Sequence, residues 1–307
     1  MDILLQQIIN GLVQGSVYAL VALGYTMVYG ILGLINFAHG EVVMIGAMVA
    51  LSVIMLLAGS GLPPLLVLAI SLMVAVMVCM ALGYGIERIA YRPLRNAPRL
   101  APLITAIGVS IVLQNLAMMF WGREYRAFPP LLPNSPHIFA GAIINEVQII
   151  IVLVALAMMA GLLLLVHRTR LGRAMRAVAE NPATAALMGV NINAVISVTF
   201  MIGSALAAVA GLMVSANYGI VHYYMGFMLG LKAFTAAVLG GIGNLRGAML
   251  GGLLLGLIES LGAGYIGDLT GGFLGSHYQD VFAFFVLIAV LVFRPSGLLG
   301  ERVAERA

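Results

Sequence analysis

The chain has 307 residues, of which 63% are hydrophobic and only 8% are charged, whereas a soluble domain carries roughly 25% charged residues. So little polar surface cannot cover this much apolar surface in water, which excludes a soluble globular protein and predicts an all-α polytopic membrane protein. The net charge of +4 comes from basic residues in short segments between apolar stretches. That pattern orients membrane helices and gives no support to nucleic-acid binding.

The apolar stretches predict a bundle of about eight or nine transmembrane helices, because a span needs about 20 mostly apolar residues. Long spans are expected at 8–29, 41–58, 65–86, 103–120, 147–166, 194–214, 248–266 and 279–293, with a shorter apolar piece at 228–241. The first stretch lacks a basic flank and a cleavage site, so we expect it to be a retained span. Residues 1–307 are interpreted as a single transmembrane domain.

The basic residues predict the orientation. No Lys or Arg precedes Arg88, and two clusters follow, which are Arg88, Arg92, Arg95 and Arg99, and then Arg168, Arg170, Arg173 and Arg176. Two spans separate the clusters, so both lie on one side, which we assign to the cytoplasm. Three further arginines, Arg294, Arg302 and Arg306, place the C-terminus there too. The N-terminus is then outside, and parity favours a crossing by 228–241. The segment 121–146 is expected outside, with Trp121 as an interfacial anchor.

Four ionisable residues occur within apolar stretches, where each costs several kcal/mol unless it is paired or hydrated. His39 and Glu41 lie at the joint between the first two spans, and they either line a polar cavity or hold a hinge near the cytoplasmic surface. Lys232 and Glu259 are expected to pair with the backbone or with each other. Four isolated groups give little support to an ion-coupled carrier.

Small residues recur at every fourth position in two late spans. One stripe comprises Gly203, Ala207, Gly211 and Ser215, and the other comprises Gly252, Gly256, Ser260 and Gly264. Such stripes let helix backbones approach closely in lipid. We expect them to be packing faces within the chain, with subunit interfaces as the alternative.

The segment 168–191 interrupts the apolar pattern with two short helices. The stretch "LGRAMRAVAE" predicts an amphipathic helix whose arginines meet lipid head groups or an acidic partner. Next, Asn181 suits an N-cap, Pro182 the first helical position and Gly189 the residue after the helix. A free helix of two turns is marginal in water, so it must rest on this bundle or on a partner protein.

Sequence motifs for catalysis are missing. Lys232 is the only lysine, and it is not part of a G-x-x-x-x-G-K-[ST] loop, so this chain has no such site for ATP. The single Cys79 and the lack of a His or Cys pair give no sign of a metal site, and no G-x-S-x-G motif occurs. An enzymatic function therefore has little support.

Five segments are similar to the permease subunit of branched-chain amino-acid ABC importers of the leucine-isoleucine-valine type. They are "ALGYTMVYGILGLINFAHGEVVMIGA" (22–47), "GIERIAYRPLR" (85–95), "LITAIGVSIVLQN" (103–115), "RLGRAMRAVAENPATAALMGVN" (170–191) and "GLKAFTAAVLGGIGNLRGAMLGGLLLGLIES" (230–260). The resemblance covers nearly the whole chain in the same segment order.

The resemblance implies a multi-pass permease of the bacterial inner membrane that works by alternating access. It implies four kinds of partner: two cytoplasmic ABC ATPase subunits, a second permease subunit, a periplasmic substrate-binding protein and membrane lipid. ATP and Mg would bind the ATPases, so this chain itself is expected to bind no cofactor. Substrates would be leucine, isoleucine or valine, with urea or another small amide or amino acid as an alternative and an ATP-independent secondary carrier as a weaker one.

The resemblance also implies roles for particular residues. The segment 168–193 would couple the permease to the ATPase. Its expected contacts are Asn181, Pro182, Ala185, Leu187, Met188 and Gly189, supported by Arg173, Arg176 and Glu180. A zwitterionic substrate needs few fixed charges along its path, so polar groups are candidates to line it, namely Asn36, His39, Gln114 and Asn115. The ionisable residues within spans, Glu41, Lys232 and Glu259, are further candidates for the pathway or for gating.

Overall fold

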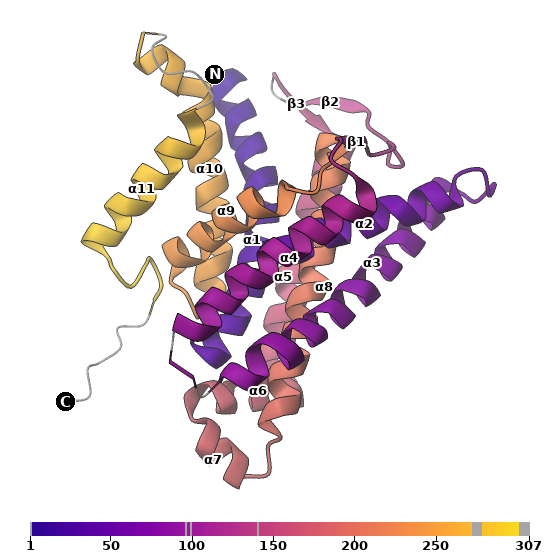
Figure 1. Cartoon of the computed structure of the whole chain (residues 1–307). Helices are drawn as coiled ribbons and strands as arrows, with labels where there is room; N and C mark the ends of the chain where they lie inside the picture. The colour runs from indigo at the N-terminus through magenta and orange to yellow at the C-terminus, as the bar shows by residue number, and fades with distance from the viewer. Residues whose placement is uncertain (1, 96, 99, 140, 272–277, 301–307) are drawn as a thin grey trace.

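The chain folds into a bundle of helices in the computed structural model, which describes all residues except 1, 96, 99, 140, 272–277 and 301–307 (Figure 1). The helices are α1 (Asp2–Leu32), α2 (His39–Leu57), α3 (Pro64–Ile86), α4 (Leu100–Trp121), α5 (Glu146–Arg168), α6 (Arg170–Glu180), α7 (Pro182–Leu187), α8 (Ile192–Tyr218), α9 (Met225–Gly240), α10 (Leu245–Leu269) and α11 (Gln279–Phe293). Arg99, Arg302 and Arg306, which contributed to the predicted orientation, lie outside the described residues.

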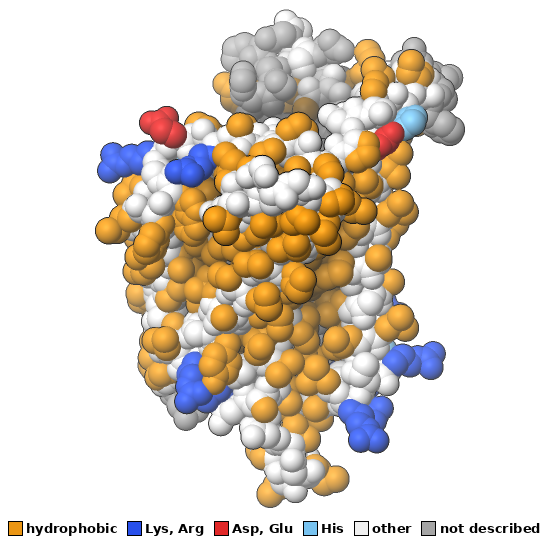
Figure 2. Space-filling model, turned by 90° about the vertical axis from the view of Figure 1, so that its right-hand side faces the viewer, with side chains coloured by type: hydrophobic (Ala, Val, Ile, Leu, Met, Phe, Trp, Pro, Cys, Tyr) orange, Lys and Arg blue, Asp and Glu red, His pale blue; other side chains and the backbone are white. Residues whose placement is uncertain are grey.

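The predicted membrane spans are confirmed as helices. Within the described residues, seven helices are long and apolar enough to cross a membrane, namely α1, α2, α3, α4, α5, α8 and α10. The apolar helices α9 and α11 are shorter. Figure 2 shows hydrophobic side chains covering the flank of the molecule, with Lys and Arg side chains near its two ends. This is the surface of an all-α polytopic membrane protein.

Three helices form the centre of the bundle. The most apolar 18-residue windows of α1, α2 and α8 are 78%, 67% and 78% buried, whereas those of α3, α4 and α5 are 22%, 22% and 28% buried. The exposed side chains of the second group are large and hydrophobic, for example Met77, Ile104 and Leu164. We conclude that α3, α4 and α5 present their outer faces to lipid.

The predicted small-residue stripes are packing faces within the chain. A Cβ atom added to Gly256 of α10 would lie 2.3 Å from the backbone nitrogen of Gly15, and one added to Gly252 would lie 2.4 Å from Cα of Ala19 in α1. In the other stripe, a Cβ on Gly211 of α8 would lie 2.2 Å from the carbonyl oxygen of Val43 in α2. At these points the helix backbones touch, which is possible only where side chains are small.

One end of the bundle, here called the hairpin end, carries the four short strands and the start of α1 (Figure 1). Strands β2 (Pro136–Phe139) and β3 (Ala142–Asn145) form an antiparallel hairpin in which His137 faces Ile144. Strand β1 (Arg126–Ala127) pairs antiparallel with β4 (Ile220–Val221), the strand between α8 and α9.

The opposite end, here called the α7 end, carries α6, α7 and the turn between α9 and α10 (Figure 1). The backbone nitrogen of Leu298 donates to the carbonyl oxygen of Leu239, 2.9 Å away, so the chain after α11 also lies at this end. The first and last described segments are therefore at opposite ends. This arrangement agrees with the predicted crossing by 228–241, now seen as the 16-residue helix α9.

A single methyl group tests the contact between α1 and α10. Gly256→Ala should lower the free energy of unfolding by about 1–3 kcal/mol, because the new Cβ forces two backbones apart. Gly161→Ala is the matched control, since a Cβ there meets nothing within 4 Å. The measurement is the melting temperature of the two purified variants in one detergent. Equal melting temperatures would contradict this account of the packing.

Candidate functional site

The segment after α5 turns back as helix α6, which packs across the end of α5. The Thr169 hydroxyl caps α6 by accepting from the backbone nitrogen of Gly172 at 3.0 Å. Met175 and Val178 are buried against the bundle, whereas Arg173 is exposed, so the predicted amphipathic helix is present. Arg176 donates from Nη1 to the carbonyl oxygen of Val166 at 2.9 Å and thereby ties α6 to α5.

Helix α7 has the predicted caps. The side-chain oxygen of Asn181 accepts from the backbone nitrogen of Thr184 at 3.0 Å, and Pro182 occupies the first turn. Gly189 follows the helix with a φ of +83°, a conformation that glycine adopts without strain. The carbonyl oxygen of Ala185 accepts from the backbone nitrogen of Val190 at 3.0 Å. These bonds fix both ends of a very short helix.

The free side of α7 is apolar. Leu187 is 87% exposed and Met188 is 80% exposed, so two large hydrophobic side chains project from the α7 end. Ala185 differs from its predicted neighbours, because it is 4% exposed and packs toward the bundle. It supports the helix from within and offers no contact surface to a partner.

A buried carboxylate connects the base of α8 to the end of α3. Glu87 is fully buried in the π-helical turn Glu87–Tyr91 that continues α3, and it accepts from Arg92 at 3.0 Å, from Arg95 and from the hydroxyl of Ser197 at 2.7 Å. Arg95 also donates to the Asn193 side chain at 2.6 Å. Glu87 was not among the predicted site residues, although an acid within two turns of two arginines was a usable signal.

Lys232 and Glu259 were expected to pair with the backbone or with each other, and the structure shows that they pair with each other. The Lys232 ammonium lies 3.3 Å from Oε1 of Glu259 and 2.7 Å from Oδ1 of Asp280. Oε2 of Glu259 accepts from the Tyr18 hydroxyl at 2.7 Å and from the Gln14 amide at 2.8 Å. The cluster joins α1, α9, α10 and α11. The sequence did not predict the other three members of this cluster. Asp280 lies near the start of a span, and Gln14 and Tyr18 lie on the otherwise apolar helix α1.

A second buried cluster surrounds the start of α2. Oε1 of Glu41 accepts from the Ser110 hydroxyl at 3.1 Å and from the Gln114 amide at 2.6 Å, both on α4. Its other oxygen, Oε2, is buried without a hydrogen-bond partner among the described residues. His39 is only 2% exposed and its ring packs on Gly24 of α1. Helix α2 thus begins inside the bundle, in contact with α1 and α4, which favours the alternative of a polar cavity over that of a hinge near the cytoplasmic surface.

The remaining pathway candidates divide between these clusters and the lipid-facing surface. Asn36 is 3% exposed and accepts from the Tyr91 hydroxyl at 3.1 Å, close to the start of α2. Asn115 is exposed and donates to the Ile111 carbonyl of its own helix, so it does not join Gln114. A separate cavity of about 220 Å³ lies beside Lys232 and Tyr18.

Known proteins with similar sequences are permease components of branched-chain amino acid transport systems. Residues 7–291 match the family described as the permease component of the branched-chain amino acid transport system. The chain is 52% identical to the high-affinity branched-chain amino acid transport system permease protein BraD of Pseudomonas aeruginosa, over 98% of this chain and 97% of that protein. It is 46% identical to the LivH permease protein of Escherichia coli K12, again over 98% and 97%. No solved structure matches the chain.

The Lys232 cluster can be tested by removing its lysine. Lys232→Met leaves Glu259 without its ion pair at a site where Glu259 is 1% exposed, which should cost about 3–5 kcal/mol of stability. Adding Glu259→Gln should recover much of the loss, since the carboxylate that remains unpaired, that of Asp280, is 30% exposed and can be hydrated. The melting temperatures of the single and double variants measure this. A double variant as unstable as the single one would contradict the ion-pair assignment.

Proposed function

The chain belongs to the family of permease components of branched-chain amino acid transport systems, and we propose that it forms part of the membrane path of an ATP-driven importer for branched-chain amino acids. The proposal is supported by relatives named for that transport and similar over almost their whole length. The sequence has no phosphate-binding loop of its own, so ATP and Mg would bind separate subunits.

The proposed contact with the ATPase is the tip of α7. The single observation that carries this assignment is an exposed apolar pair, Leu187 and Met188, on a helix capped at both ends. A rigid apolar knob of this kind can fill a recess on a partner protein, where its burial stabilises the complex. Asn181, Pro182 and Gly189 contribute by holding the helix in shape, and exposed Arg173 and Glu180 lie on the preceding helix.

A force on α7 would reach the spans through short, bonded connections. The Asn191 side chain accepts from the backbone nitrogen of Ala194 at 3.1 Å and starts α8 only a few residues after α7. The Glu87 network then links the first turns of α8 to α3. ATP binding can shift the bundle from one state to the other only if the partner subunits bind ATP with a higher affinity in one of the two states. The α7–α8–α3 connection would transmit that difference.

We assign the α7 end to the cytoplasm and the membrane to the bacterial inner membrane. The described arginines of this end are Arg88, Arg92, Arg95, Arg168, Arg170, Arg173, Arg176, Arg246 and Arg294, whereas Arg123 and Arg126 lie toward the hairpin end. This asymmetry favours a cytoplasmic α7 end. The hairpin end would then face the periplasm, where a substrate-binding protein would dock, and a second permease subunit would complete the path.

The α7 contact predicts the effect of one substitution. Leu187→Asp should abolish ATP-dependent uptake, because the contact with the ATPase would bury the new carboxylate among apolar side chains without a hydrogen-bond partner. Leu187→Met keeps an apolar side chain and should retain uptake, which makes it the matched control. The measurement is uptake of radiolabelled leucine, together with the amount of each variant in the membrane. Uptake at the original rate by Leu187→Asp would contradict the assignment.

The orientation predicts which cysteines a membrane-impermeant thiol reagent reaches. Ala194→Cys in the first turn of α8 should react only in inverted membrane vesicles, whereas Ser135→Cys near the hairpin should react in intact spheroplasts. Both positions are exposed, and the native Cys79 is buried and provides a silent background. The reverse labelling pattern would show that the α7 end lies outside the cell.

A further inference from the structure

A cavity of about 900 Å³ lies at the α7 end, where three spans stop or start. The last residues of α1 and α5, the middle of α6 and the first residues of α10 line it. The named lining residues include Tyr29, Val166, His167, Arg176, Gly243 and Arg246. The ends of membrane spans lie at the level of the lipid head groups. The cavity therefore opens at the depth of the lipid head groups.

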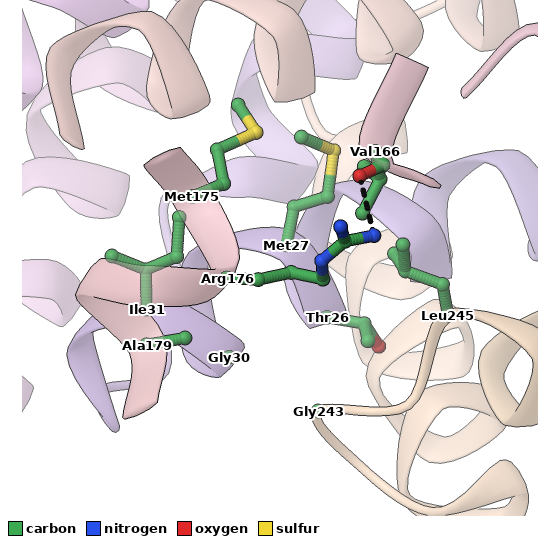
Figure 3. A pocket seen from close by; sticks show the side chains of 10 residues that line it. All are labelled: Thr26, Met27, Gly30, Ile31, Val166, Met175, Arg176, Ala179, Gly243 and Leu245. Carbon is green, nitrogen blue, oxygen red and sulfur yellow. Dashed lines mark hydrogen bonds between the residues drawn. The ribbon is translucent and has the colours of Figure 1, made fainter. Parts of the chain in front are cut away.

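The described charged residues that line the cavity are all basic. Arg176 enters from α6 and Arg246 from α10, and no Asp or Glu is among the described residues that line it. Figure 3 shows the adjoining recess, in which the Arg176 side chain crosses from α6 toward α5 and one guanidinium nitrogen bonds Val166. A guanidinium has five N–H donors, so further donors remain for a ligand. Arginines from two distant segments thus favour an anion in this space.

The recess also contains a buried hydroxyl group. Thr26 of α1 is 1% exposed, and its Oγ1 has no hydrogen-bond partner among the described residues, although it lines the recess. Around it the wall is apolar, with Met27, Ile31 and Leu245. A buried hydroxyl without an acceptor costs free energy, which an incoming oxygen acceptor would recover. The site therefore combines positive charge, a free donor and apolar walls.

We infer that this cavity binds the phosphate-bearing head group of an anionic phospholipid from the cytoplasmic leaflet. Basic pockets between membrane helices on the cytoplasmic side recognise such head groups. Arg176 and Arg246 pair with the phosphate, Thr26 donates to an oxygen, and the apolar wall receives the glycerol and the upper acyl chain. The bound lipid fills the space between α6 and α10 and braces α6 against the spans. The choice of leaflet rests on the proposed orientation, but the binding itself does not.

The test measures binding of phosphatidylglycerol to the purified full-length chain by native mass spectrometry. Arg246→Gln should weaken binding about fivefold, and Arg176→Gln together with Arg246→Gln roughly 25-fold, the effects expected for one and two arginines near an anionic head group. Thr26→Val, which removes only the hydroxyl from a nearly isosteric side chain, should also weaken it. Arg126→Gln at the hairpin end is the matched control and should bind like the unchanged chain.

Three results would overturn the inference. One is equal binding by Arg246→Gln and Arg126→Gln at equal melting temperature in lipid-free detergent. Another is equal affinity for phosphatidylethanolamine, which carries no net charge. The third is full displacement of the lipid by millimolar inorganic phosphate, which would assign the site to a free anion. None of these readouts uses transport, so failure here leaves the proposed importer function untouched.

Discussion

Direct contact between the backbones of α1 and α10 is the constraint on which the rest of the bundle depends. Apolar side chains gain little by leaving lipid for a protein interior, so membrane helices associate through close packing and hydrogen bonds. Gly15 and Gly256 provide the close packing. The same approach brings Gln14 and Tyr18 of α1 within hydrogen-bond distance of Glu259 on α10. A carboxylate that would be costly in lipid is thereby satisfied, and Lys232 and Asp280 add α9 and α11 to the same centre.

The α7 end is organised around short links between rigid elements. Caps from Thr169, Asn181 and Asn191 start α6, α7 and α8 in succession, so the exposed tip of α7 cannot move far without moving the first turn of α8. Glu87 extends this connection to α3. The basic cavity lies beside the same elements, between α6 and α10. Partner contact, helix connection and head-group binding thus involve one end of the molecule.

Local sequence signals predicted what local physics determines. The length of the apolar stretches predicted the spans, and Asn181, Pro182 and Gly189 predicted α7 with its caps, because these effects act within a few residues. Lys232 and Glu259 were expected to pair because an isolated charge in lipid is costly.

The third partner, Asp280, could not be predicted, since its position depends on how α11 packs. The same holds for the contact of Glu41 with Ser110 and Gln114, and for the start of α2 inside the bundle. Burial of Ala185 beside exposed Leu187 depends on how α7 is placed against the bundle.

The central claim is that this chain is the membrane subunit of an ATP-driven importer, driven through its α7 end. The most direct measurement is purification of the tagged chain from native membranes in mild detergent, followed by mass spectrometry of its partners and uptake assays in liposomes. The account predicts stoichiometric recovery of ATPase subunits and a second permease, with amino-acid uptake that requires ATP. Recovery of the chain alone, still transporting in liposomes without ATP, would contradict it.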